Sequence, residues 1–385
     1  MSCLALNRLN IMTDQSALLA FKSQFEQEPG NVLARNWSSD TPVCSWTGIT
    51  CSSRHLRVAA INVPNMDLSG IIPPQLGNLS FLVSLDLSGN KFHGGLPQEL
   101  AKLKRLRVNP PSLSNISKLE TLNLKSNLLE SMIPAEIGDL HNLKRLVLGE
   151  NNLSGPIPAS IFNISTLEAA AFTSNSLSGN LPANMCRHMP NLKSFSVAFN
   201  QLHGHIPSTI DECLKLQTLA FEYNQFTGPV PKQIGNLSML EILYLGNNNN
   251  LKGEIPAEVG YLPNLEILSL SADGIRGPIS SFIYNISTLQ ELYLDENNLT
   301  GNLPQIYVLR LPSLQGLYLS ANKLAGSNPR QLGNCSSLVE IYMDENMLTG
   351  EIPSEIGNLL NLEILVYDKN QLTGDIRLQS SISQP

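Results

Sequence analysis

Tyrosines and carboxylates recur in this chain at a fixed step, and together they could bind cationic groups. Tyr244, Tyr293, Tyr318 and Tyr342 lie at steps of 24 or 25 residues, with Ser269 at the intervening step. Tyrosine supplies a large contact area at a low entropic cost, and carboxylates orient basic groups. The pattern predicts a surface for an extended peptide that carries Lys or Arg side chains. The acidic residues beside the tyrosines are Asp295, Glu296, Asp344, Glu345 and Asp368, with Glu222 and Tyr223 nearer the N-terminus.

A second interpretation of the tyrosines remains open. Tyrosine is favoured on exposed strands, so it could have spread simply because repeats were duplicated.

Catalytic chemistry has no support in the sequence. It contains no Gly-rich phosphate loop, no H-R-D or D-F-G kinase element, no G-x-S-x-G and no H-E-x-x-H. His203 and His205 flank a glycine, but no third metal ligand accompanies them, and we interpret them as part of a solvated loop. The sequence therefore predicts a binding protein, with no enzyme activity, cofactor or metal.

The spacing of the tyrosines reflects a repeat of the form L-x-x-L-x-L-x-x-N-x-L-x-G-x-I-P. Self-similarity at 20–29 residues with this leucine spacing is typical of a leucine-rich-repeat solenoid. In one repeat, Leu146 and Leu148 are two apart and therefore face inward from a short strand. Met66 and Asp273 replace the repeated asparagine. The asparagines in register are Asn127, Asn151, Asn175, Asn200, Asn224, Asn249, Asn297, Asn322, Asn346 and Asn370.

The chain divides into a cap, a repeat array and two tails. We predict a disordered tail over residues 1–12, a cap of helix plus disulfide lid over 13–57, and a disordered tail over 378–385. About fourteen repeats fill 58–377. The third is incomplete at about 100–113, because only 37 residues separate Asn90 from Asn127, where two repeats need 48. Stacked repeats share one core and need capped ends.

Cysteine pairs and glycosylation sequons both favour an extracellular protein. Cys44 and Cys51 lie seven apart around Trp46, and we predict that they form a disulfide. For Cys186 and Cys213 a disulfide and a buried thiol remain alternatives. The N-x-S/T sequons are Asn36, Asn78, Asn115, Asn152, Asn163, Asn236, Asn285, Asn298 and Asn334.

Charge and hydropathy exclude two kinds of partner. The net charge is −7, with 25 Lys plus Arg and no basic run, which argues against nucleic acid. No stretch of 18 apolar residues could span a bilayer. The first residues lack a basic segment followed by an apolar one, so no signal peptide is visible. We interpret this as a truncated or misassigned start, the alternative being a cytosolic protein.

The lid W…C-x-W-x-G-x-x-C and repeats such as Leu153-Ser-Gly155-Pro-Ile-Pro158 resemble the extracellular region of plant leucine-rich-repeat receptor-like kinases, in particular subfamily XII. The resemblance implies an α/β solenoid, a right-handed superhelix with a concave parallel β-sheet and an N-terminal cap. It also implies a peptide or pathogen-derived epitope on the concave face, and a co-receptor kinase of the somatic-embryogenesis-receptor type. Signalling would be immune or developmental, at the outer face of the plasma membrane. The transmembrane helix and the kinase of such receptors are not in this chain.

Two other functions compete with a receptor ectodomain. A secreted inhibitor of a microbial wall-degrading enzyme, like the polygalacturonase-inhibiting proteins, has similar repeats but usually about ten of them and a C-terminal cysteine cap. A cytosolic scaffold is opposed by the sequons and by the lid cysteines.

Overall fold

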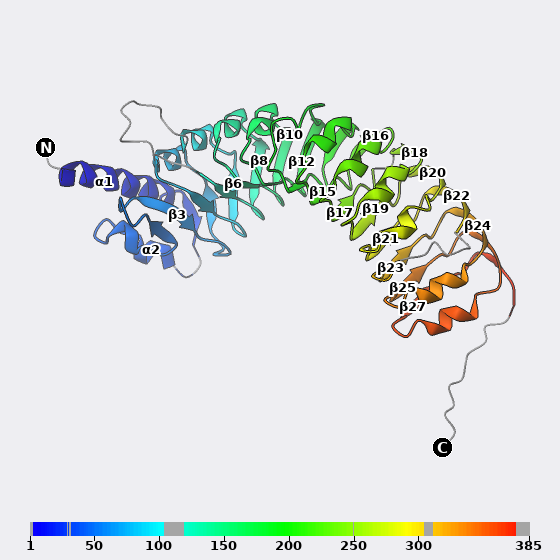
Figure 1. Cartoon of the computed structure of the whole chain (residues 1–385). Coiled ribbons are helices and arrows are strands. Elements are labelled where there is room, and N and C mark those ends of the chain that lie inside the picture. Colours follow the sequence, from blue (N-terminus) through cyan, green and yellow to red (C-terminus); the bar gives the residue numbers. More distant parts are fainter. Residues whose placement is uncertain are drawn as a thin grey trace, which may run out of the picture. The chain divides into compact units, whose positions relative to one another are not determined.

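The computed structural model describes residues 3–28, 30, 32–103, 119–248, 250–303 and 311–374. Internal contacts divide the chain into two units, Met1–Leu202 and His203–Pro385. In each unit, short parallel strands succeed one another in chain order with few α-helices (Figure 1). This is the leucine-rich-repeat solenoid fold that the sequence predicts.

The N-terminal cap of the first unit consists of five short elements packed on the first coils. Strand β1 (Phe25–Gln27) pairs antiparallel with β4 (Ser69–Ile71), and β2 (Ile49–Cys51) pairs antiparallel with β3 (Val58–Asn62), so the cap completes two sheet edges. Trp37 and Trp46 are fully buried and stack at 5.4 Å between ring centroids. The disulfide between Cys44 and Cys51 is present as predicted, with Cα atoms 5.5 Å apart. The cap elements are α1 (Cys3–Lys22), β1 (Phe25–Gln27), α2 (Val32–Asn36), η1 (Val43–Ser45) and β2 (Ile49–Cys51).

The prediction of a disordered tail over residues 1–12 is wrong for residues 3–12, which belong to α1. This segment contains Leu, Ala, Arg and Met, which are good helix formers, and neither Gly nor Pro. Asp14 therefore lies inside the helix instead of at its N-terminus. Asp14 is fully buried. Its carboxylate accepts two hydrogen bonds from the Arg57 guanidinium, from Nε at 2.7 Å and from Nη2 at 2.6 Å, and a third from the backbone N–H of Val58 at 3.0 Å. This ion pair ties the cap to the first coil.

Each coil contributes one three- to five-residue strand to the main sheet. The register is exact at the central residue: Leu122 pairs with Leu146, and Leu292 with Leu317. In the first unit the strands are β3 (Val58–Asn62), β5 (Ser84–Asp86), β7 (Thr121–Asn123), β9 (Arg145–Val147), β11 (Ala169–Ala171) and β13 (Ser194–Ser196). In the second unit they are β15 (Thr218–Ala220), β17 (Ile242–Tyr244), β19 (Ile267–Ser269), β21 (Glu291–Tyr293), β23 (Gly316–Tyr318), β25 (Glu340–Tyr342) and β27 (Ile364–Val366).

A second set of parallel strands follows the repeated asparagines. In the first unit these strands are β4 (Ser69–Ile71), β6 (Lys91–Gly94), β8 (Leu128–Met132), β10 (Asn152–Pro156) and β12 (Ser176–Asn180). At the unit boundary, β14 (Gln201–His205) pairs through His203 with β16 (Gln225–Thr227). The later strands are β18 (Lys252–Gly253), β20 (Gly274–Pro278), β22 (Asn298–Asn302), β24 (Lys323–Ser327), β26 (Met347–Gly350) and β28 (Gln371–Leu372).

Short 3₁₀ helices close the coils, most of them directly after the proline of the repeat. Proline fixes its own φ and lacks an N–H, which suits the start of a helix. These helices are η2 (Pro74–Asn78), η3 (Gln98–Leu103), η5 (Ala135–Asp139), η6 (Ala159–Asn163), η7 (Ser208–Glu212), η8 (Lys232–Asn236), η9 (Ala257–Tyr261), η10 (Ile283–Asn285), η11 (Arg330–Asn334) and η12 (Ser354–Asn358).

The apolar positions of the repeat form the core, as predicted. In the coil from 140 to 161, Leu143, Leu146, Leu148 and Leu153 are fully buried. Burial of each such side chain contributes about 1.5–3 kcal/mol, and neighbouring coils supply the contacts that one coil cannot make alone.

The repeated asparagine hydrogen-bonds both its own coil and the preceding one. Asn322 Nδ2 donates to the carbonyls of Leu319 and Ser320 in its own coil, at 3.2 and 3.1 Å. It also donates to the carbonyl of Leu294 at 2.9 Å, while its Oδ1 accepts from the N–H of Leu299 at 2.9 Å. Because these backbone groups are buried, the amide satisfies polar groups that water cannot reach.

The prediction that Asn249 belongs to the series of repeated asparagines is wrong. Asn248, not Asn249, occupies the buried position: it is 2% exposed, and its Oδ1 accepts from the N–H of Phe226 at 3.0 Å. Two residues separate Asn248 from Leu251, whereas a single residue separates the asparagine from the leucine in a repeat such as Asn151-Asn152-Leu153. Asn249 lies outside the described residues. Where Asp273 replaces the asparagine, its Oδ1 accepts from the N–H of Asn248 at 2.9 Å.

The predicted incomplete repeat at about 100–113 lies mostly outside the described residues, as does the C-terminal tail. The strands on either side pair directly, Ser84 with Thr121, so no strand separates β5 from β7.

Two asparagines of the 247–250 run provide a direct test of this register. We expect Asn248→Ala to destabilise the second unit by about 2–4 kcal/mol, because it leaves buried backbone donors and acceptors unpaired. Asn250→Ala, at an exposed position two residues later, is the matched control and is expected to change stability by less than about 0.5 kcal/mol. Urea denaturation of both variants measures the difference. Equal midpoints would show that the register assigned here is incorrect.

Candidate functional site

The predicted tyrosines form one row across the main sheet of the second unit. The strand register pairs Tyr244 with Ser269, Ser269 with Tyr293, Tyr293 with Tyr318, and Tyr318 with Tyr342. All four phenol side chains are half-buried, and each lies between two inward-facing apolar residues. Strand alternation therefore places them on the outward face of the sheet.

Three of the tyrosines stack on one another. The rings of Tyr293 and Tyr318 are 4.4 Å apart with an angle of 8° between planes, and those of Tyr318 and Tyr342 are 5.3 Å apart at 17°. Such spacing follows from adjacent parallel strands, which lie about 4.8 Å apart. Tyr244 stands apart from this stack, because Ser269 occupies the strand between it and Tyr293.

Aspartates form a parallel row two residues after the tyrosines. Asp295 and Asp344 each accept a hydrogen bond from a serine of the preceding coil: Ser271 Oγ donates to Asp295 Oδ1 at 2.6 Å, and Ser320 Oγ donates to Asp344. These bonds hold the carboxylates in place and leave oxygen lone pairs for another partner. Asp368, at the same position of β27, is exposed.

Glu296 and Glu345 lie one residue further on, in the left-handed backbone region, with φ of 55° and 54°. Both are exposed. Glu345 forms a salt bridge with Lys369 of the next coil.

Two glutamates and one glycine of the site were missed from the sequence. Glu291 and Glu340 start strands β21 and β25, two residues before Tyr293 and Tyr342, and so share the outward face. Tyr318 Oη donates to Glu340 Oε2 at 2.8 Å. Gly316 starts the strand between them, where a Cβ would lie only 2.0 Å from Glu291 Oε2 and 2.6 Å from a ring carbon of Tyr318. The missing side chain thus makes room for both neighbours. Alternation within the strands could have identified these positions.

The carboxylates and phenols of this surface perturb one another. Burial raises the pKa of Glu291, and the charge of Glu340 adds to that effect, whereas a hydrogen bond with Tyr293 opposes it. No donor among the described residues reaches Glu291 Oε2, although this atom is shielded from solvent. Burial also raises the pKa of Tyr318, as do its bond to Glu340 and the nearby charges. The phenol of Tyr318 therefore remains a neutral donor at physiological pH, beside carboxylates that are partly shielded from water.

Glu222 and Tyr223 lie in the turn after β15, in the rows of Asp295 and Glu296 and not in the tyrosine row. Tyr223 is 47% exposed with φ of 54°. Burial raises the pKa of Glu222 to about 7, and no described residue hydrogen-bonds its Oε2. Burial raises the pKa of Tyr244, and the charges of Glu222 and Glu291 raise it further. Glu222 thus belongs with Tyr244, while Tyr223 stands at the edge of the predicted site.

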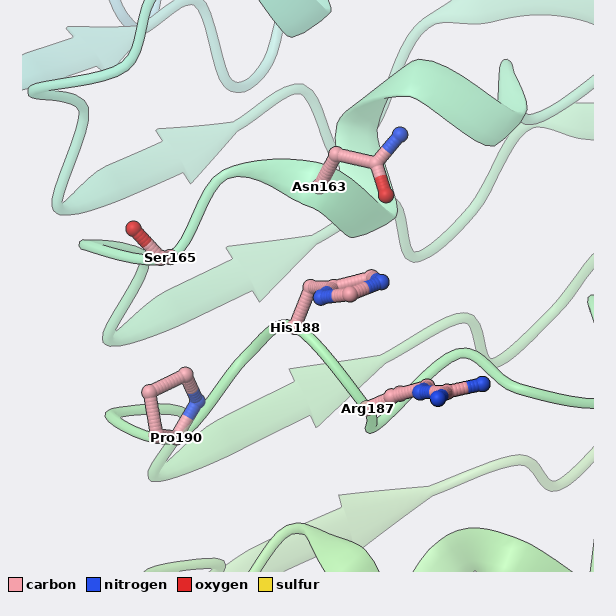
Figure 2. Close-up of a pocket in the computed structure, with 5 residues that line it drawn as sticks. All are labelled: Asn163, Ser165, Arg187, His188 and Pro190. Atoms are coloured by element: carbon pink, nitrogen blue, oxygen red, sulfur yellow. The ribbon is translucent and has the colours of Figure 1, made fainter.

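The first unit has a different surface. The outward residues of β11 and β13 are Ala169, Ala171, Ser194 and Ser196, which are small. A shallow depression elsewhere in this unit is lined by Asn163, Ser165, Arg187, His188 and Pro190 (Figure 2). There His188 lies between Asn163 and Arg187. It contains a sequon and shares no residue with the tyrosine surface.

The remaining predicted residues are cysteines and sequon asparagines. Cys186 and Cys213 are both disulfide-bonded, which settles the alternatives in favour of disulfide bonds, and Cys335 is a buried free thiol. Asn36 is half-buried, and Asn115 lies outside the described residues. The other sequon asparagines are exposed, and their occupancy remains a prediction: Asn78, Asn152, Asn163, Asn236, Asn285, Asn298 and Asn334.

The two histidines beside Gly204 do not belong to a metal-ligand cluster of the described residues. His205 Nδ1 is hydrogen-bonded to the carbonyl of Thr227 at 3.0 Å. Within the described ranges, no three His, Cys, Asp or Glu residues converge as metal ligands. None of the helices described is long and apolar enough to cross a bilayer.

The raised pKa of Glu222 predicts a pH-dependent stability. Its folded pKa of about 7 exceeds the usual value of about 4.3, so the protonated group favours the folded state. That stability is complete below about pH 4 and is lost as the pH rises through 7. We expect Glu222→Gln to raise the Tm above wild type by about 2 °C or more at pH 8, with the two curves converging at pH 4.

Differential scanning calorimetry at both pH values measures this effect. The exposed Glu254→Gln is the matched control and is expected to show no such divergence. Parallel Tm profiles for Glu222→Gln and wild type would contradict the prediction.

Comparison with known families agrees with this architecture. The chain matches the leucine rich repeat N-terminal domain over residues 12–52, and leucine rich repeats over 81–103, 118–140, 142–164 and 287–348. It is 44% identical over 99 residues to a putative receptor-like protein kinase of Arabidopsis thaliana. It is 40% identical over 100 residues to the LRR receptor-like serine/threonine-protein kinase EFR of the same plant. Each alignment covers 26% of this chain but only 10% of the relative.

Solved structures show the same fold over most of the chain. The PEPR1–AtPEP1 structure is 32% identical with a TM-score of 0.81, and the match covers 94% of this chain and 49% of PEPR1. The ectodomain of the receptor kinase GASSHO1/SCHENGEN3 from Arabidopsis thaliana, in complex with CASPARIAN STRIP INTEGRITY FACTOR 2, is also 32% identical, with a TM-score of 0.77 and coverage of 93% and 44%. The chain thus spans about half the length of these ectodomains. The chain contains a leucine rich repeat N-terminal domain and leucine rich repeats, and the proteins to which it is similar are plant LRR receptor-like kinases.

Proposed function

We propose that this chain is the ligand-binding ectodomain, or part of one, of a plant cell-surface receptor kinase, and that it binds a basic extended peptide on the tyrosine row of its second unit. The stack of Tyr293, Tyr318 and Tyr342, framed by carboxylates on both sides, carries this proposal. Ligand binding by a leucine-rich-repeat ectodomain is also seen in the structure of GASSHO1/SCHENGEN3 with CASPARIAN STRIP INTEGRITY FACTOR 2, which supports this role.

The charge of the tyrosine surface favours a cationic ligand. The strands and turns at 290–297, 315–322, 339–346 and 363–370 contain eight acidic residues and one basic residue, Lys369. Lys369 is itself paired with Glu345. A cluster of negative carboxylates attracts a basic peptide at long range and then orients it. The acidic residues are Glu291, Asp295, Glu296, Glu340, Asp344, Glu345, Glu363 and Asp368.

Ser269 marks the position in the row where a ligand side chain fits best. It lies between Tyr244 and Tyr293, which are two strands and hence about 10 Å apart. A planar group between two rings requires about 7 Å, at 3.5 Å on each side. A guanidinium is planar and stacks on aromatic faces. Glu222 and Glu291, whose charges both reach Tyr244, supply the countercharge.

Another structural neighbour is a receptor for a peptide hormone. One further match, at 30% identity and a TM-score of 0.66, is the plant peptide hormone receptor RGFR1 in complex with RGF2; it covers 83% of this chain and 56% of RGFR1. An extended peptide across parallel strands can contact several coils at once, which suits a row of equivalent side chains.

The location and the partners follow from the same proposal. The protein would act at the outer face of the plasma membrane, and its sequons suit that environment. A co-receptor kinase of the somatic-embryogenesis-receptor type, and an immune or developmental role, remain predictions from the family resemblance. The ligand is a peptide, and a pathogen-derived epitope is one source of such a peptide.

Removing two stacked rings tests the surface directly. We expect Tyr293→Ala combined with Tyr318→Ala to weaken binding of a synthetic arginine–glycine nonapeptide at least tenfold, while the Tm falls by no more than a few degrees. The rings are outward-facing, so the leucine core remains intact. Isothermal titration calorimetry measures the affinity, and a glutamate–glycine nonapeptide serves as the negative probe. Unchanged affinity would contradict the proposed binding surface and would indicate that the tyrosines are present only because tyrosine is favoured on exposed strands.

The position of Ser269 gives a sharper test. We expect Ser269→Tyr to fill the space between Tyr244 and Tyr293 and to weaken binding of the arginine–glycine peptide about tenfold or more. Ser269→Ala keeps the space open and is expected to bind as wild type does. A lysine–glycine peptide should depend less on this position, because ammonium is not planar. Equal affinities of the two Ser269 variants would exclude this position from the binding surface.

A further inference from the structure

An aromatic pair is exposed on the 3₁₀-helix side of the second unit, away from the tyrosine row. Tyr261 ends η9 and Phe282 immediately precedes η10. Their rings meet edge to face with centroids 5.1 Å apart, yet they remain 56% and 44% exposed. In three other coils the position equivalent to Phe282 is polar: Gln233, Gln331 and Glu355. The pair is therefore not required by the repeat.

The backbone beneath the pair fixes the orientation of Phe282. A Cβ on Gly260 would lie 2.4 Å from the Cβ of Phe282 and 2.9 Å from the backbone N of Ile283. Only glycine permits this close approach of η9 to the next coil. Phe282 is thus seated on Gly260 with its ring beside Tyr261, and its outer face is open to solvent.

The sequon Asn285-Ile-Ser287 lies on the same side of η10 as Phe282. The N–H of Asn285 donates to the carbonyl of Phe282 at 3.1 Å, which is the i to i+3 bond of a 3₁₀ turn. At three residues per turn, side chains at i and i+3 eclipse one another. The exposed Asn285 side chain therefore lies on the same face of η10 as Phe282.

We propose that Phe282 and Tyr261 form a docking platform for an N-linked glycan on Asn285. The first N-acetylglucosamine has one face of C–H groups with slight positive charge, and the face of an aromatic ring is negative. Contact between the two faces removes apolar area from water, including the exposed ring of Phe282. The platform thus orients the sugar and shields an aromatic pair that would otherwise be exposed.

Other sequons in the same register lack the aromatic neighbour. Asn236 ends η8 and Asn334 ends η11, and three residues before each is a glutamine, Gln233 or Gln331. A glycan on either asparagine would meet no ring in its own turn. The proposal depends on passage through a glycosylating compartment, but not on the peptide ligand or on the tyrosine row.

A double-mutant cycle on the secreted glycoprotein tests the platform. The four proteins are wild type, Phe282→Leu, Ser287→Ala and the double variant; leucine keeps an apolar side chain without a ring, and Ser287→Ala removes the sequon while retaining Asn285. We expect Phe282→Leu to lower the Tm by roughly 1–3 °C more when the sugar is present than when it is absent, because without the sugar only the contact with Tyr261 is lost. Glycopeptide mass spectrometry measures occupancy of Asn285.

The matched control is the same cycle at Asn236, with Gln233→Leu and Ser238→Ala. We expect the effect of Gln233→Leu there to be independent of the sugar. Coupling at Asn285 alone supports the platform. An unmodified Asn285 in the secreted protein overturns the proposal, as does an equal loss of Tm with and without the sequon. Peptide binding by the tyrosine row is measured separately and is expected to remain unchanged in all four proteins.

Discussion

The buried side-chain amide of the repeated asparagine is the interaction on which the architecture depends. A coil turns out of its strand at this point, where backbone carbonyls and N–H groups are shielded from water and must find partners. Asn151 provides such partners in its own coil and in the preceding one. Its Nδ2 donates to the carbonyls of Leu148 and Gly149 in its own coil and of Leu124 in the preceding coil. Its Oδ1 accepts from the backbone N–H of Leu129 in the preceding coil. Each asparagine thereby fixes the register between adjacent coils, and the leucine core can be continuous only in that register.

The proposed binding surface is a consequence of this register. Because the central strand residues pair without slippage, equivalent outward residues lie one strand apart, and repeated tyrosines must stack. The same spacing lines up Asp295 with Asp344, and it allows Ser271 and Ser320 to hold these carboxylates. A row of like side chains is therefore produced by repetition. Its local character depends on departures from repetition: Ser269 interrupts the stack, and Gly316 makes room for Glu291 and Tyr318.

Electrostatics distinguish this surface from the other features of the chain. Glu222 and Glu291 each have a carboxylate oxygen without a described donor, and burial raises the pKa of both. Partly desolvated carboxylates are unfavourable unless a cation or a proton compensates them. A basic ligand would relieve that penalty, which is why the acidic frame around the tyrosines supports cation binding better than the rings do alone. The buried Asp14–Arg57 pair in the cap is already compensated, and its role is to join the cap to the first coil.

The sequence alone determined the fold, because the leucine and asparagine spacing admits one arrangement of stacked coils. It also determined the Cys44–Cys51 disulfide and the tyrosine row, since both follow from local spacing and strand alternation. Only the tertiary structure decided that Asn248 and not Asn249 is buried, because an inserted residue shifts the count without changing the residue type. Glu291, Glu340 and Gly316 likewise became part of the site only when neighbouring coils brought them within reach of Tyr318. Contacts between coils join residues about 24 positions apart, and their geometry depends on side-chain packing that no single repeat contains.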